Sequence, residues 1–291
     1  MSAPTATPTA PADTVSSGVG VGRIGEVARR RGRGLRVLVL FGILFALAQL
    51  PDPAGYLGTD SGAKGAALEA MQRNGGFDPD LGYWAAAADP DARFHPFRGT
   101  VVTDDGRYVD VPTLPLLLVA EPLYAAGGMR LALAVPVAGA VAAAAAVAAL
   151  AARLAPASAA AGARRRAFWI TGLGSPVTVY ALDPWEHTWG VALMVAGVVL
   201  VLDARRPEVP VPARLVRAAG AGLAFGVAAT LRQEALVYGL VAGCVLLAAL
   251  VRSGRRRVLA AAGAVMAGTT LLVLVANAAL EEAVLGSLVR A

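Results

Sequence analysis

The run Leu131–Ala152, LALAVPVAGAVAAAAAVAALAA, decides the fold class of this chain. It contains no charged residue, and its length matches the ~20 residues that an α-helix needs to cross a bilayer. Other apolar runs follow the same pattern and occupy residues 35–50, 167–182, 188–202, 215–231, 235–251 and 258–280. Several are shorter, so we expect them to cross a thin membrane or to include flanking residues. The sequence therefore predicts an all-α integral membrane protein with about seven transmembrane helices.

The composition supports this class and excludes others. Of the 291 residues, 57% are hydrophobic and only 16% are charged, which is too apolar for a soluble domain of this size. The net charge is +6, but the arginines form short clusters beside apolar runs rather than one basic face. This pattern indicates membrane lipids as partners and argues against nucleic acid. The only cysteine, Cys244, lies inside an apolar run, so no intrachain disulfide can form.

The amino-terminal part differs in composition from the rest. Residues 1–28 are rich in Ser, Thr, Pro, Gly and Ala, and we predict that they are disordered. Residues 1–34 are then a cytoplasmic segment ahead of a transmembrane module at 35–291. The tripeptide Ala46-Leu47-Ala48 resembles a signal-peptide cleavage site. The long leader and the many later spans favour an uncleaved anchor instead.

The arginine clusters predict which side of the membrane each connection faces. With a cytoplasmic amino terminus and seven spans, the clusters within 29–36, 153–166, 205–214 and 252–257 all lie inside, as the positive-inside rule requires. The apolar segment 113–127 is interrupted by prolines and by a glutamate. Counting it as a span would place the later clusters outside. We therefore expect a re-entrant or interfacial helix there, within a long extracytoplasmic loop at 51–130 that contains short interfacial helices.

That loop begins with a polar stretch, GYLGTDSGAKGAALEAM at residues 55–71. One interpretation makes Asp60 a helix N-cap and Lys64 its ordinary partner one turn later. The other makes Asp60 a carboxylate at the membrane surface that accepts a proton from a hydroxyl. The aromatic residues further along the loop, such as Tyr83 and Trp84, are typical of a membrane-interface belt.

Two other outer stretches carry ionisable residues at the ends of spans. Asp183, Glu186 and His187 lie in SPVTVYALDPWEHTWG, and Arg232 and Glu234 lie in ATLRQEALVYG. Ionisable groups are costly at a membrane and gather where a polar substrate or a partner charge offsets that cost. We expect these stretches to share one face with Asp60 and Lys64. The alternative is that the arginine and glutamate pair in a solvated turn.

Metal ligation has weaker support in the sequence. The two histidines, His95 and His187, have no HxxxH spacing and the chain has no CxxC motif, so a zinc site is not expected. A Mg or Mn ion held by Asp60, Asp183 and Glu186 is an alternative that nothing in the sequence requires. No cofactor is predicted.

Four stretches carry a resemblance to a known family: TDSGAKGAALEAM, FRGTVVTDDGRYVDVPTLPLLLVAEPLYAAGG, SPVTVYALDPWEHTWGVAL and GLAFGVAATLRQEALVYGL. Together they resemble the amino-terminal half of C-type (GT-C) glycosyltransferase-like membrane proteins of actinobacterial kind. The resemblance covers about residues 35–291 as a pattern of spans and short motifs. Members of this superfamily are usually longer, with more spans and often a soluble carboxy-terminal domain.

The resemblance implies an activity and roles for the candidate residues. A hexosyl or pentosyl group would pass from a polyprenyl-phosphate donor to an acceptor hydroxyl on the extracytoplasmic face of the plasma membrane, with or without a divalent metal. Asp60 matches the position of the catalytic base. Lys64 and Arg232 would bind the leaving phosphate, and Glu186 and His187 would position donor or acceptor.

Two other classes of function remain open at this point. A non-catalytic membrane protein, a scaffold or a reduced relative, would bind a lipid-linked sugar without turnover, and the short chain favours it. A secondary transporter would show repeated halves and ionisable residues at mid-membrane. The sequence has no internal repeat, and its ionisable residues lie at span ends. The sugar, acceptor, isoprenoid and oligomeric state are not specified by the sequence.

Overall fold

The computed structural model describes residues 18–52, 55, 59–97, 99–110, 113–253 and 256–286. The chain is mostly helical and divides into two compact units, residues 1–39 and 40–291. The first helix, α1 (Gly18–Ala48), crosses the boundary between them. It starts well before the predicted span at 35–50 and includes residues 18–28, where the sequence predicted disorder. Arginine is a good helix former, and a helix extends cooperatively from an established apolar stretch. The predicted disorder of residues 1–17 lies outside the described residues.

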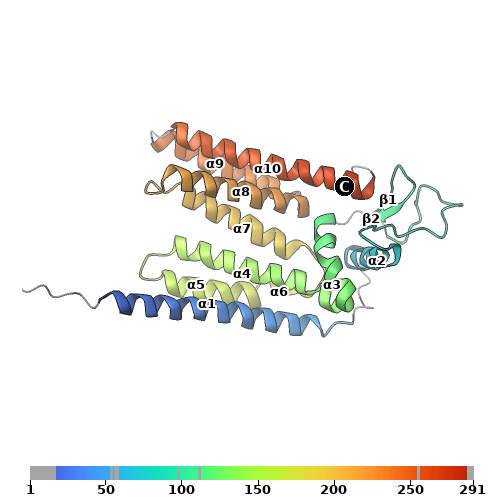
Figure 1. Ribbon diagram of the computed structural model, residues 1–291, viewed down its shortest axis with the longest axis horizontal. Coiled ribbons are helices and arrows are strands. Elements are labelled where there is room, and N and C mark those ends of the chain that lie inside the picture. The colour runs from blue at the N-terminus through green and yellow to red at the C-terminus, as the bar shows by residue number, and fades with distance from the viewer. Residues whose placement is uncertain are drawn as a thin grey trace, which may run out of the picture. The chain divides into compact units, whose positions relative to one another are not determined.

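Four helices of the second unit are long and apolar enough to cross a membrane: α4 (Ala134–Leu154), α7 (His187–Ala204), α8 (Val211–Leu231) and α10 (Arg256–Leu285). They pack in the order α4, α7, α8, α10 (Figure 1). Helix α9 (Ala235–Ser253) packs against α8 and α10 and contributes a shorter apolar stretch, Ala235–Val245. The all-α class and the membrane-compatible helices agree with the sequence prediction.

The predicted span at 167–182 consists of two helices separated by a turn, α5 (Ala160–Leu173) and α6 (Pro176–Tyr180). The chain turns at Gly174 and Ser175 because Pro176 has no N–H to continue the helix. The Ser175 hydroxyl donates to the carbonyl of Thr171 and accepts from the N–H of Val177. The Ser175 hydroxyl thus satisfies one backbone carbonyl at the end of α5 and one backbone N–H at the start of α6.

The long polar loop folds into elements at one end of these helices (Figure 1). Helix α2 (Thr59–Asn74) is followed by a hairpin of β1 (Thr100–Val102) and β2 (Tyr108–Asp110), in which Val101 lies opposite Val109. The turn between them contains Gly106, which has a φ of 81°, and the sequence analysis did not predict the strands. Helix α3 (Leu114–Ala132) packs on α2 and breaks at Gly127 and Gly128.

Close packing between α8 and α10 depends on a glycine. A Cβ at Gly222 would overlap the Thr269 hydroxyl and the carbonyl of Met266. The Thr270 hydroxyl donates to the Gly222 carbonyl across the same contact, at 3.0 Å. Small residues that let helix backbones approach are typical of helix packing in membranes.

We predict that Gly222→Ala lowers the free energy of unfolding by about 1–3 kcal/mol, because the new methyl group overpacks this contact. The matched control is Gly268→Ala in α10, where a Cβ would meet no atom within 4 Å; it should be neutral or slightly stabilising. Thermal and denaturant unfolding of the purified chain in detergent measures both. Equal effects of the two substitutions would contradict the packing argument.

The connections between the helices lie at two opposite ends. The 181–186 and 232–234 connections lie at the end that carries α2, whereas the 205–210 connection and the start of α10 lie at the other (Figure 1). Asp60, Glu234 and Glu208 are exposed.

In a Cys244→Ala background, we expect Asp60→Cys and Glu234→Cys to react with a membrane-impermeant maleimide in intact cells. Glu208→Cys should react only after permeabilisation, because the positive-inside rule predicts a cytoplasmic location for the arginine-rich end. Labelling of Glu208→Cys in intact cells would refute this sidedness. So would a failure of Asp60→Cys and Glu234→Cys to react until the cells are permeabilised.

Candidate functional site

The first turns of α2 carry three polar residues of the site. The helix begins at Thr59, so Asp60 lies within the first turn and is not the N-cap that one interpretation predicted. A carboxylate is favoured there by the helix dipole. Asp60 is exposed, whereas Ser61 and Lys64 are only 4% and 5% exposed. The helix therefore presents a solvent-accessible carboxylate one turn from a buried ammonium.

Lys64 belongs to an ion cluster made of Lys64, Glu186, Arg232 and Glu234. Lys64 Nζ lies 3.1 Å from Glu186 Oε2, and Arg232 Nη1 lies 3.3 Å from Glu186 Oε1. Arg232 also donates to Glu234 Oε1 from Nε and Nη2, at 2.8 and 2.6 Å. Three stretches far apart in the chain thus meet through their charges. The expected pairing of Arg232 with Glu234 is present, but it forms part of this larger cluster rather than an isolated turn.

Glu186 is the centre of the cluster and is itself 5% exposed. Burial alone would raise the pKa of its carboxyl, but the charge of Lys64 and the Lys64 hydrogen bond outweigh burial and hold that pKa below its usual value. Glu186 is the residue before α7. The buried carboxylate therefore stays ionised because two cations flank it.

Asp183 is connected to the site by a hydrogen bond with Ser61 of α2. Its Oδ1 accepts a hydrogen bond from the Ser61 hydroxyl. Burial raises the pKa of Asp183, opposed by that hydrogen bond and by Lys64, while the charges of Asp60 and Glu186 raise it further. Asp183 and Glu186 are three residues apart, yet their environments shift their affinities for a proton in opposite directions.

The structure adds Asp110, which the sequence prediction missed. This last residue of β2 is 9% exposed. Burial raises the pKa of its carboxyl; Lys64 opposes that shift, Asp60 adds to it, and His95 opposes it. Asp110 thus lies within electrostatic reach of Asp60 and Lys64. The available sequence signal was an acidic residue between two valines in an otherwise apolar strand.

His187 lies beside the ion cluster and among aromatic rings. Its Nδ1 is 3.6 Å from Glu186 Oε1, and its ring centroid lies 4.6 Å from Tyr180 and 4.9 Å from Trp185. Trp185 Nε1, His187 Nδ1 and Thr188 Oγ1 are buried and have no hydrogen-bond partner among the described residues. The segment between α6 and the start of α7 therefore has polar atoms that could bond to a ligand beside the ion cluster.

The aromatic residues of the loop form a separate group on the opposite face of α2. Tyr83 contacts His95 and Tyr108, with ring centroids 4.9 and 5.4 Å apart. A cavity of about 230 Å³ lies among Tyr83, Trp84, His95 and the α2 residues Glu69 and Arg73. Trp84 is 91% exposed. These residues do not join the ion cluster.

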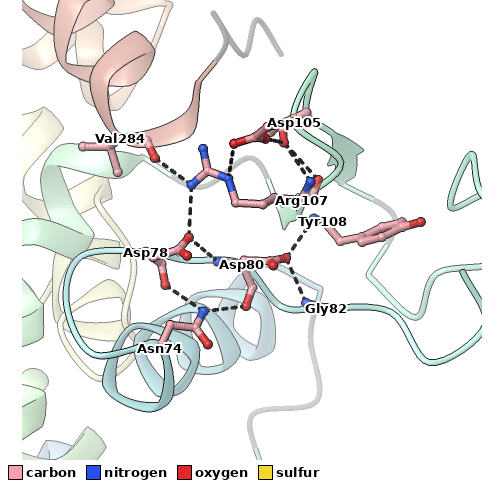
Figure 2. Close-up of polar contacts among 9 residues, drawn as sticks. Asn74, Asp78, Asp80, Gly82, Asp105, Arg107, Tyr108 and Val284 are labelled. Atoms are coloured by element: carbon pink, nitrogen blue, oxygen red, sulfur yellow. Dashed lines mark hydrogen bonds and ion pairs between the residues drawn. The ribbon is translucent and has the colours of Figure 1, made fainter.

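A polar network holds the loop in place (Figure 2). Asp80 Oδ1 accepts hydrogen bonds from the N–H groups of Gly82 and Tyr108. Arg107 Nη1 donates to Asp78 Oδ1 at 3.2 Å and to the Val284 carbonyl of α10 at 2.9 Å. The hairpin is therefore tied both to the segment after α2 and to the end of the last helix.

The candidate metal ligands have other partners. Within the described ranges, no group of three or more His, Cys, Asp or Glu residues is arranged to hold a metal ion. Asp183 bonds to Ser61, and Glu186 pairs with Lys64 and Arg232. The sequence alternative of a divalent ion held by Asp60, Asp183 and Glu186 thus finds no such group in this geometry.

Comparison with protein-family models, curated proteins and solved structures finds no match to this chain.

We predict that Lys64→Met lowers the free energy of unfolding by about 3 kcal/mol or more at pH 7, because it leaves Glu186 buried with one cation fewer. The matched control is Arg93→Met. It removes an ion pair with Asp91 whose side chains are 75% and 69% exposed, and such a pair contributes at most ~1 kcal/mol.

The pH dependence follows from the lowered pKa of Glu186. Its contribution to stability is present above its unfolded value near 4.5 and is lost as the pH falls through the lower folded value. In Lys64→Met the largest influence opposing burial is removed, so Glu186 takes up a proton at a higher pH than in the wild type. The stability difference from wild type should be largest near neutrality and shrink in acid, as denaturant unfolding across pH measures. A difference that does not depend on pH would contradict this assignment.

Proposed function

We propose that this chain is a membrane glycosyltransferase of the GT-C type, with seven spans and a cytoplasmic amino terminus, that transfers a sugar from a polyprenyl-phosphate donor. The observation that carries the proposal is the position of Asp60 beside the ion cluster. This exposed carboxylate lies one helical turn from Lys64, which shares Glu186 with Arg232. A base and two cations beside the ends of membrane-compatible helices suit transfer from a lipid-linked phosphate.

The reaction assigns a role to each group. Asp60 takes the proton from the acceptor hydroxyl as that oxygen attacks the anomeric carbon of the donor. The bond between the anomeric carbon and the phosphate oxygen breaks, and polyprenyl phosphate leaves with the electron pair. Arg232 and Lys64 stabilise the negative charge that develops on this phosphate. Arg232 keeps 31% of its side chain exposed while paired, so its guanidinium has room for a ligand.

The remaining predicted residues support these groups. Glu186 holds the two cations in place, and Glu234 orients the Arg232 guanidinium through two hydrogen bonds. Asp183 and His187 flank the turn whose unpaired polar atoms offer hydrogen bonds to sugar hydroxyls. Asp110 adds a second buried carboxyl, whose pKa is raised by burial and also by the charge of Asp60.

An apolar groove supports a lipid-linked donor. It encloses about 640 Å³ between α8, α9 and α10 and includes Leu236, Gly239, Leu240, Met266 and Leu271. Leu236 lies only four residues after Arg232. A phosphate at Arg232 would therefore have an isoprenoid chain close to an apolar surface of the helices.

We expect Asp60→Asn to reduce transfer at least about a hundredfold, the typical contribution of a general base, while expression and insertion stay unchanged. Membranes would be incubated with polyprenyl-phosphate pentoses and hexoses, and release of polyprenyl phosphate would be measured. The matched control is Asp104→Asn in the hairpin turn, which is also exposed and should retain activity.

Measuring donor binding together with turnover distinguishes the enzyme from the alternative, a protein that binds the lipid-linked sugar without transferring it. If wild type binds a donor but releases no polyprenyl phosphate from any member of the panel, the chain is a lipid-linked-sugar binder. If it turns over and Asp60→Asn retains full activity, Asp60 is not the base.

A further inference from the structure

Arg214 is a buried cation at the end of the helices opposite the candidate site. It is 2% exposed and is among the largest fully buried side chains of the chain. Its Nη2 donates to the carbonyls of Arg206 and Val209 at 3.0 and 3.1 Å. Its Nε is buried and has no hydrogen-bond partner in the part of the chain that the structure describes. The guanidinium is thus held by the α7–α8 connection through Nη2, while its Nε–H donor is unused.

No carboxylate among the described residues forms an ion pair with Arg214. Asp203, an acid at this end of α7, already pairs with Arg153 at 2.6 Å and Arg206 at 3.4 Å. Arg217 donates to the Asp203 carbonyl. A buried charge without a counter-ion is costly and marks a site for an anion.

Arg214 lines a pocket of about 670 Å³ that holds further positive charge. The pocket is formed by residues 207–210, the start of α8, and the start of α10 with Arg256 and Arg257. Its three arginines face one acid, Glu208. The amino-terminal ends of two long helices also meet here, and their dipoles and backbone N–H groups favour an anion.

From this juxtaposition we infer that the pocket binds a phosphate group, either the headgroup of an anionic lipid or a soluble phosphate. Guanidinium groups bind phosphate oxygens in pairs of hydrogen bonds, and three arginines with one acid leave an excess of positive charge that the negative charge of a phosphate group would offset. This site is independent of the proposed sugar transfer, because it lies at the other end of the helices and uses none of the ion-cluster residues.

The test uses the full chain in phosphatidylcholine nanodiscs. One arm titrates phosphatidylglycerol into the nanodisc and the other adds inorganic phosphate, with melting temperature as the readout. Wild type should show a saturable rise in one arm. The double variant Arg256→Gln, Arg257→Gln should weaken the apparent affinity about tenfold or more, since it removes two charge-assisted contacts. The matched control is Arg165→Gln, Arg166→Gln on α5, which removes two exposed arginines and should respond like wild type.

Each outcome of this experiment either supports the phosphate site or overturns it. A response to phosphatidylglycerol alone that is lost in the double variant assigns the site to a lipid headgroup, and a response to inorganic phosphate assigns it to a soluble phosphate. Arg214→Gln should abolish the response; should it fail to insert, the double variant decides. The inference is overturned if wild type shows no saturable rise in either arm, or if the double variant and its control respond equally.

Discussion

The ion cluster around Glu186 is the constraint on which the polar end of this protein depends. A carboxylate that is 5% exposed is tolerable only because Lys64 and Arg232 both lie within 3.3 Å of it. Those two cations come from α2 and from the residue after α8. Pairing them with one acid positions the loop helix over the connection between α6 and α7, and so brings Asp60 and Asp183 to the same place.

The ionisable residues at the two ends of the helices differ in how far their charges are neutralised. At the end with α2, cations and carboxylates neutralise each other in one cluster, and the loop is secured by the Asp78, Asp80 and Arg107 network. At the other end, arginines outnumber acids and Arg214 remains buried without a carboxylate partner among the described residues. The first arrangement suits a site for chemistry on a polar substrate, and the second suits retention of an anion.

Much of the helical framework was predictable because apolar runs must form helices wherever lipid offers no hydrogen bonds to the backbone. The long helices fall where the runs 131–152, 188–202, 215–231 and 258–280 lie. The misses have local causes. The run at 167–182 has no charged residue, but Pro176 divides it. The strands at Thr100 and Tyr108 are too short for an alternating pattern to be distinctive.

For the site, the sequence by itself determined which residues were candidates, because ionisable groups at the ends of apolar runs stand out against a hydrophobic chain. It identified Asp60, Lys64, Glu186 and Arg232, but it paired Lys64 with Asp60 as neighbours on one helix. Only the tertiary structure decided that Lys64 bonds to Glu186 and that Asp110 lies nearby. The physical reason is that a buried charge takes the partner that folding brings within ion-pair distance, and the separation of residues along the chain does not specify that distance.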